Sequence, residues 1–258
     1  SLGLGQGAYN SRTYYKLSLL PQYIHRLNKQ EIVMFKAGAS IDDSNRDESK
    51  FSPIAEISWQ KNDDVGSSER LYLTYAQATQ VLGYSAIGGA KSSPFISDPN
   101  LRRGVSKNLE LGYHLERDKW KLIGAVFHRW NKDLVDWLYT SSSARSAKHV
   151  DVNTIGVEII ASRQWNNFEA IGSYSYLHKN EDYGDSNLTR SLYTLNFPEH
   201  RATFGFIWKL NDFLEIRIDN EWREQKENEG RDGPTQSTYS HLAASYYPTQ
   251  IDDLEVFI

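Results

Sequence analysis

The stretch NLELGYHLERDKWKLIGAVFHRW, residues 108–130, contains two runs of alternating apolar and polar residues on either side of a charged break. Alternation with a period of two indicates β-strands that have one apolar face. If Arg117 and Asp118 form a two-residue turn, Leu115 pairs with Trp120, and both strands place their apolar residues on the same face. Opposite charges then meet across the other face. The stretch therefore predicts an antiparallel hairpin with one apolar and one charged face.

The same pattern recurs along the whole chain, and it predicts about twelve strands. They are expected over 12–26, 31–43, 51–60, 68–78, 106–117, 119–131, 150–162, 167–178, 199–209, 213–224, 237–248 and 252–258. Short turns near Asn28, Asp63, Asp118, Asn166, Asn211 and Thr249 alternate with long loops at 43–50, 79–105, 132–149, 179–198 and 224–236. Strict alternation is typical of a transmembrane β-barrel, which has short periplasmic turns and long external loops.

The faces of the predicted strands also favour a membrane barrel. Around Glu215, apolar residues alternate with the charged residues Glu215, Arg217, Asp219, Glu221 and Arg223. A face that is charged along its whole length requires water, and the lumen of a barrel provides it. The fold predicted from these patterns is all-β, an antiparallel up-and-down transmembrane sheet from a large barrel.

The composition excludes several other classes of protein. The 258 residues include 29 Lys and Arg, 33 Asp and Glu and no Cys, so the net charge is −4. A weakly acidic chain gives no reason to expect nucleic acid as a partner, and the absence of Cys excludes disulfides and thiolate metal sites. No apolar run approaches the roughly 18 residues that a transmembrane helix needs. Mean hydropathy is −0.61, which a barrel tolerates because only alternate residues face lipid.

Aromatic residues make up 13% of the chain, and the tryptophans lie close to the predicted strand ends. Trp59, Trp120, Trp165 and Trp208 lie near short turns, whereas Trp130, Trp137 and Trp222 lie near long loops. Two aromatic belts are typical of a protein that crosses a membrane. The alternative is that these residues form the core of a soluble β-protein, which would not explain the alternation of turns and loops.

Several segments resemble the β-barrel of TonB-dependent receptors in both order and spacing. They are FSPIAEISWQ (51–60), RLYLTYAQATQ (70–80), DPNLRRGVSKNLELGYHL (98–115), NTIGVEIIASRQW (153–165), GSYSYLHK (172–179) and FPEHRATFGFIWKL (197–210). The resemblance extends over 51–258, and over 1–50 it rests on the strand pattern alone. The chain departs from the family at Arg103 and Gly104, where a Lys-Pro-Glu motif is usual.

The resemblance implies that residues 1–258 are part of a barrel of about 22 strands with a plugged lumen. The plug and the last strands would lie outside this sequence. It implies an outer-membrane receptor of a Gram-negative bacterium that takes up a large scarce ligand, such as a ferric siderophore, cobalamin or a glycan. The TonB complex would supply the energy through the plug, and membrane lipid and lipopolysaccharide would surround the wall. No cofactor is implied. Twelve strands alone would have two open edges, so we expect this chain by itself not to form a native barrel.

The long loop 79–105 is the first candidate for contact with the ligand. It carries Gln80, Tyr84, Arg102 and Arg103, and Arg is suited to anionic metal chelates. An ordinary solvated loop is the alternative for each of these residues. The second aromatic and basic loop, 137–148, is a weaker candidate.

Other functions receive less support from the sequence. A passive porin or the translocator barrel of an exported protein would share the strand pattern. An outer-membrane phospholipase would need an outward Ser beside an outward His; His128 is predicted to face outward, next to Ser106 or Lys107. No Gly-x-Ser-x-Gly motif occurs, and none of the seven histidines stands at a metal-ligand spacing from another. No catalytic residue and no metal site are therefore predicted.

Overall fold

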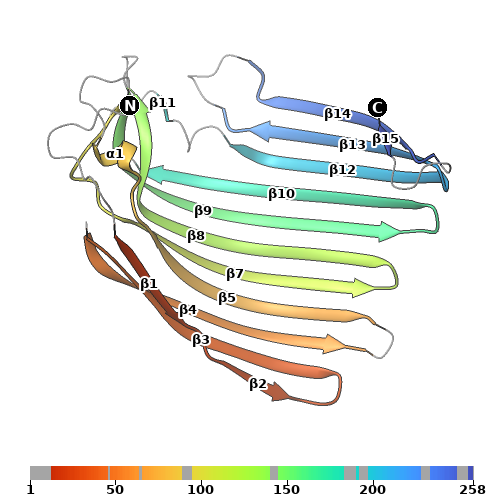
Figure 1. Cartoon of the computed structure of the whole chain (residues 1–258), viewed down its shortest axis with the longest axis horizontal. Coiled ribbons are helices and arrows are strands. Elements are labelled where there is room, and N and C mark those ends of the chain that lie inside the picture. The colour runs from red at the N-terminus through yellow and green to blue at the C-terminus, as the bar shows by residue number, and fades with distance from the viewer. Residues whose placement is uncertain are drawn as a thin grey trace.

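The chain forms one curved sheet (Figure 1). The computed structural model describes residues 13–45, 47–63, 66–88, 95–139, 145–182, 190–191, 197–227, 233–248 and 255–257. The principal strands are β1 (Tyr14–Leu19), β3 (Glu31–Ser44), β4 (Asp47–Asn62), β5 (Ser68–Gln80), β7 (Gly104–Arg117), β8 (Trp120–Tyr139), β9 (Arg145–Gln164), β10 (Phe168–Asp182), β12 (Pro198–Asn211), β13 (Leu214–Gln225), β14 (Gln236–Tyr246) and β15 (Val256–Phe257). They are hydrogen-bonded in this sequential, antiparallel order. The predicted all-β fold, with an up-and-down antiparallel sheet, is confirmed.

Three short strands and one helix complete the described structure. β2 (Gln22–Arg26) pairs with β3, β6 (Phe95–Ile96) pairs in parallel with β9, and β11 (Arg190–Ser191) pairs with β8. The helix α1 (Tyr84–Gly88) precedes β6. No helix in the described parts of the chain has the length and apolar character needed to cross a membrane.

The strand boundaries correct three predictions. Most of the predicted long loop 43–50 is strand, because β3 continues to Ser44 and β4 begins at Asp47. The predicted strand 12–26 is divided into β1 and β2, because Pro21 between them has no N–H to donate to the ladder. The predicted long loop 132–149 consists largely of strand, since β8 continues to Tyr139 and β9 begins at Arg145. These two strands therefore extend the sheet well beyond their neighbours at the long-loop edge (Figure 1).

The register of the central hairpin differs by two residues from the prediction. Arg117 pairs with Trp120, Leu115 pairs with Leu122, and the turn consists of Asp118 and Lys119. Both turn residues have positive φ, +48° and +69°, which is the geometry of a two-residue turn that matches the twist of the strands. The predicted faces are nevertheless correct, because a shift of two residues does not exchange the two sides of a strand.

This turn provides a stability test. Lys119→Gly removes the Cβ that makes a left-handed backbone costly, so we expect it to stabilise the protein by up to about 1 kcal/mol. The measurement is the urea midpoint of the full-length natural protein refolded into lipid vesicles. Lys119→Ala removes the same charge but keeps a Cβ, and it should leave the midpoint nearly unchanged. A lower midpoint for the Gly variant would show that this turn is not strained.

The outer face of the sheet is apolar and exposed. The register aligns Ile57, Leu73, Leu111, Val126 and Val157 in one row across β4, β5, β7, β8 and β9. Each of these side chains is between 37% and 50% exposed. Soluble proteins seldom expose a continuous apolar patch of this extent. This face therefore needs an apolar environment.

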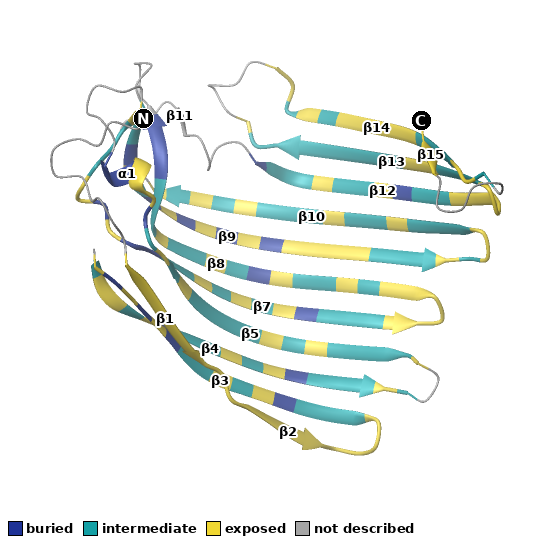
Figure 2. Ribbon diagram, viewed as in Figure 1, coloured by how far each residue is buried: buried dark blue, intermediate teal, exposed yellow. Residues whose placement is uncertain are grey.

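The opposite face carries polar residues and is the more buried of the two in several strands. Buried and exposed residues therefore occur along the same strand (Figure 2). Ser40, Ser52 and Ser58 are at most 2% exposed. Glu56 forms ion pairs with Arg70 at 2.8 Å and with Lys36 at 3.4 Å, and Glu221 does so with Arg201 at 2.8 Å and Arg223 at 2.7 Å. The sheet is thus inverted relative to a soluble β-protein, with polar groups gathered on its inner face and large apolar groups outside.

The tryptophans that were expected near short turns lie at the short-turn edge of the sheet. Arg163 lies over the rings of Trp120 and Trp165, at 5.0 Å and 4.9 Å. Trp59 and Trp208 lie three residues before the ends of β4 and β12. Trp130 and Trp222 lie further toward the long-loop edge, on the outward side of β8 and β13 by register. Their role as membrane-interface residues remains a prediction.

Trp137 does not belong to an aromatic belt. It is only 9% exposed and packs edge-on against Phe95, with ring centroids 5.2 Å apart. The sequence suggested a belt because a long loop was expected at 132–149. In the structure Trp137 belongs to strand β8, and α1 and β6 pack against it.

Candidate functional site

The long-loop edge carries a small hydrophobic cluster, which holds the predicted ligand loop in place. Its members come from α1 and its flanks and from the extended strands: Leu82, Ala86, Ile87, Leu101, Trp137 and Ala147. β6 adds parallel pairing with Arg145 and Ser146 of β9. The described part of the loop 79–105 is therefore packed onto the extension of β8 and β9, where it forms a fixed surface above the sheet (Figure 1).

A hollow of about 380 Å³ lies in this surface. Gln80, Leu82, Gly83, Ser85, Ala86, Gly104, Asp133, Leu134, Val135 and Trp137 line it. Its lining combines an apolar wall from the hydrophobic cluster with the polar groups of Gln80, Ser85 and Asp133. This is the kind of lining that small ligands use, since apolar contacts give affinity and a few polar groups give orientation.

Asp133 connects two of the predicted ligand residues. The Arg102 guanidinium donates to Asp133 at 2.8 Å, and the Arg102 side chain is still 72% exposed. The backbone N–H of Arg102 donates to His149 Nε2 at 2.8 Å. Gln80 lies in the same hollow as Asp133. The structure therefore places Gln80 in the same hollow as Asp133 and pairs Asp133 with Arg102, whose guanidinium remains open to solvent.

Asp133 occupies an irregular position in the sheet. The pairing of β8 with β9 shifts between Asn131 and Leu134, and Asp133 has a φ of +54°. Its backbone N–H donates to Asp151 at 2.8 Å. Bulges of this kind redirect a side chain. The sequence did not identify Asp133, because a bulge leaves no clear mark in a pattern that was interpreted as a loop.

Tyr84 is the first residue of α1 and is 36% exposed. It does not line the hollow. It remains a predicted contact for a ligand that approaches from outside, separate from the pair formed by Gln80 and Arg102.

The prediction for Arg103 needs correction. Its side chain is 1% exposed and forms ion pairs with Asp42 and Asp47. Its Nε donates to Asp47 at 3.0 Å, and Asp42 also accepts from Thr79 at 2.7 Å. Burial lowers the pKa of the Arg103 guanidinium from its ordinary value, although an arginine side chain keeps its charge in proteins. The Arg103 side chain is held by its ion pairs with the β3–β4 hairpin, so it is not available to a ligand.

The sequence could not distinguish the two neighbouring arginines. Both follow a turn and precede a strand, so composition and spacing treat them alike. Asp42 and Asp47 lie more than fifty residues earlier in the chain, and only the sheet register brings them to Arg103.

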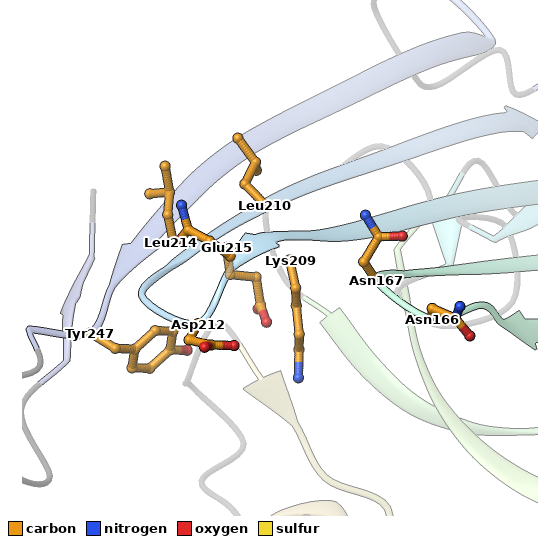
Figure 3. A pocket seen from close by; sticks show the side chains of 9 residues that line it. Asn166, Asn167, Lys209, Leu210, Asp212, Leu214, Glu215 and Tyr247 are labelled. Atoms are coloured by element: carbon orange, nitrogen blue, oxygen red, sulfur yellow. The ribbon is translucent and has the colours of Figure 1, made fainter.

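A second, polar hollow of about 440 Å³ lies at the opposite edge, between two short turns (Figure 3). Asn166 and Asn167 come from the turn between β9 and β10, Lys209 comes from the end of β12, and Asp212 comes from the turn that follows it. It lies far from the predicted ligand loop along the strands. In the described parts of the chain, no group of three or more His, Asp or Glu side chains could hold a metal ion.

Comparison with known proteins identifies the family. The family model for the β-barrel of TonB-dependent receptor-like proteins matches residues 28–256. No curated protein sequence matches the chain.

Solved structures share this fold at low sequence identity. One is the copper transporter OprC, with a TM-score of 0.65 and 13% identity over 93% of this chain and 41% of that one. Another is the FrpB iron transporter from Neisseria meningitidis, with a TM-score of 0.63 and 16% identity over 95% of this chain and 40% of that one. A third is the siderophore receptor PirA from Pseudomonas aeruginosa, with a TM-score of 0.63 and 14% identity over 91% and 40%.

The chain thus spans about two fifths of the length of these structures. They are transporters and receptors rather than enzymes. The family match covers most of the sequence and agrees with the inverted faces of the sheet. The chain therefore belongs to the TonB-dependent receptor β-barrel family and is a protein of the bacterial outer membrane.

Proposed function

We propose that this chain forms part of the wall of a receptor that imports a scarce nutrient across the outer membrane, with energy from the TonB complex. The inverted sheet carries the proposal: an apolar outer face meets lipid, and a charged inner face meets a solvated lumen. The fixed surface at the long-loop edge adds a place where a ligand from outside can first bind.

The proposed ligand is an anionic metal chelate of the ferric siderophore type. Two of the similar structures are an iron transporter and a siderophore receptor, and the exposed guanidinium of Arg102 is suited to anionic oxygen donors. Arg102, Gln80 and Tyr84 are the proposed contacts. A cobalamin or a glycan would use the same surface with fewer charged contacts.

Uptake by living cells tests the proposal. In iron-limited cells of the source bacterium, deletion of the gene should reduce uptake of radiolabelled ferric siderophores to background for at least one chelate of a panel. Deletion of the TonB gene should give the same loss, because a plugged barrel does not transport without energy. Uptake that is unchanged without TonB would indicate a passive porin. If no chelate loses uptake when the gene is deleted, the proposed ligand class is wrong.

Substitutions at the long-loop edge test the ligand contacts. Arg102→Ala combined with Gln80→Ala should weaken binding of the transported chelate by about 10- to 100-fold, since a hydrogen bond to a charged group contributes about 1.5–3 kcal/mol. The dissociation constant of the full-length protein in detergent, from fluorescence quenching, gives the measurement. Arg117→Ala removes an exposed arginine at the opposite edge and should leave binding unchanged. If the unmodified protein, the double variant and Arg117→Ala all bind the chelate with equal affinity, the ligand binds elsewhere.

A further inference from the structure

The short-turn edge of the sheet carries a polar groove that transport does not explain. The hollow of about 440 Å³ between the β9–β10 and β12–β13 turns (Figure 3) adjoins a hollow of about 320 Å³ beside Asp118 and Lys119 of the β7–β8 turn. The two hollows share Asn166 and Asn167. Together they form one groove, which we call the rim groove. The short turns of an outer-membrane barrel lie on the periplasmic side, so a ligand of this groove comes from the periplasm.

The rim groove is long enough for a polymer. It extends from the β7–β8 turn to Tyr247, which directly follows β14. Six steps between neighbouring strands separate β7 from β14, and steps of about 4.8 Å give a length of about 29 Å. A free ion or a single small solute would occupy only part of this length. An extended chain of linked units is the shape of ligand that fills it.

Backbone hydrogen bonds hold the turns that form the rim groove in place. Lys209 N–H donates to Asn167 C=O at 2.8 Å, which joins the β9–β10 turn to β12. Gln164 N–H donates to Lys119 C=O at 3.1 Å, which joins β9 to the β7–β8 turn. Tyr247 N–H donates to a carbonyl of the β12–β13 turn at 2.9 Å. The groove is therefore preformed, and a preformed site loses less conformational entropy when it binds a ligand.

The rim groove presents charges of both signs. Lys209, Asp212 and Glu215 line it, and Figure 3 shows their side chains on the same side of the β12–β13 turn. Lys209 and Glu215 are partners in the sheet register. Even so, none of the three charged residues takes part in an ion pair found among the described residues. This set suits a ligand that carries both carboxylates and amino groups, because each group can meet an opposite charge.

The other polar residues of the rim groove suit a sugar with N-acetyl groups. Asn166 and Asn167 are exposed where the two hollows meet, and an Asn side chain can both donate to and accept from an acetamido group. Tyr247 is 37% exposed, and its hydroxyl donates to Glu255 at 3.2 Å. A tyrosine held in this way offers an apolar ring beside polar groups, which suits the face of a sugar.

We propose that the rim groove binds peptidoglycan, the periplasmic polymer of N-acetylated amino sugars with short stem peptides. The glycan runs along Asn166, Asn167 and Tyr247. A stem peptide places a carboxylate at Lys209 and an amino group at Asp212. Peptidoglycan offers sugars, carboxylates and amino groups together on this side of the membrane. Binding here attaches the receptor to the cell wall, and it is independent of the transported ligand, which is proposed to bind at the opposite edge.

Co-sedimentation of the full-length natural protein in detergent micelles with purified peptidoglycan sacculi tests the site. The double variant Lys209→Gln/Asp212→Asn should bind with an apparent affinity lower by roughly tenfold or more, because it loses hydrogen bonds to charged groups. The matched double variant Lys29→Gln/Glu31→Gln removes a cation and a carboxylate at another short turn and should bind like the unmodified protein. Removal of the stem peptides with an amidase should weaken binding of the unmodified protein to a similar extent, with little further effect on Lys209→Gln/Asp212→Asn.

Four results would overturn the proposal. The first is that the unmodified protein does not sediment with the sacculi, and the second is that the two double variants bind equally well. Unchanged binding to sacculi without stem peptides would show that no peptide occupies the rim groove. Equal binding to chitin, which has N-acetyl groups but no peptides, would show a general affinity for polysaccharides. Migration of the unheated proteins in SDS gels and their urea midpoints confirm that each variant is folded.

Discussion

Arg103→Ala is expected to lower the free energy of unfolding by about 3–5 kcal/mol, because it leaves buried carboxylates without their cation. Arg103 and Asp42 have side chains that are 1% and 2% exposed, and Asp47 shares the same guanidinium at 22% exposure. Water cannot replace the lost charge at Asp42. The measurement is urea unfolding of the full-length natural protein in lipid vesicles, followed by tryptophan fluorescence.

Arg102→Ala is the matched control for this substitution. It removes the same side chain one residue earlier, where the guanidinium is 72% exposed, and exposed ion pairs contribute only about 0–1 kcal/mol. A triple variant, Arg103→Met with Asp42→Asn and Asp47→Asn, removes all three charges and should be less destabilising than Arg103→Ala alone. Similar losses for Arg102→Ala and Arg103→Ala would mean that burial does not set the cost.

Gly38→Ala is expected to cost about 1–3 kcal/mol or more, because it introduces an atom where two backbones meet. A Cβ on Gly38 would lie 2.9 Å from Leu20 Cα and closer still to the carbonyl oxygen of Leu19. A backbone segment cannot rotate away as a side chain can. This position lies opposite the break between β1 and β2, where Ala37 N–H donates to Pro21 C=O at 3.4 Å.

Limited proteolysis gives the local readout for Gly38→Ala. Cleavage between Leu19 and Pro21 should become faster, because β1 and β2 must move away from β3 to make room. Gly172→Ala is the control, since a Cβ there meets nothing nearer than Thr203 O at 3.9 Å. If Gly38→Ala unfolds at the same urea concentration as Gly172→Ala and is cleaved no faster, the close approach at Gly38 is not required for stability.

Much of the fold could be predicted from the sequence, because a β-strand has a strict period of two. The alternation around Leu109 and Glu215 assigns each residue to one face of its strand. This assignment is correct even where the predicted pairing partner on the next strand is wrong. This is why the hairpin at Asp118 was predicted with the correct faces but with a turn displaced by one position. Aromatic spacing and loop alternation then favoured a membrane barrel over a soluble sheet, and the family match agrees.

The extension of β8 and β9 and its cover could not be predicted in the same way. Residues 132–149 have a bulge at Asp133 that interrupts the alternation, so they were interpreted as a loop. Trp137 was assigned to a membrane belt, although α1 and β6 bury it. Both errors have one cause: a sequence pattern reports which face a residue occupies, but not which distant segment lies against that face.

The sequence by itself therefore determined the all-β class, the apolar and charged faces and the edge that carries the long loops, since these depend on neighbours in the chain. Only the tertiary structure decided that Arg103 is locked between Asp42 and Asp47 while Arg102 faces solvent. These outcomes depend on register and on bulges, which place residues from distant parts of the chain side by side.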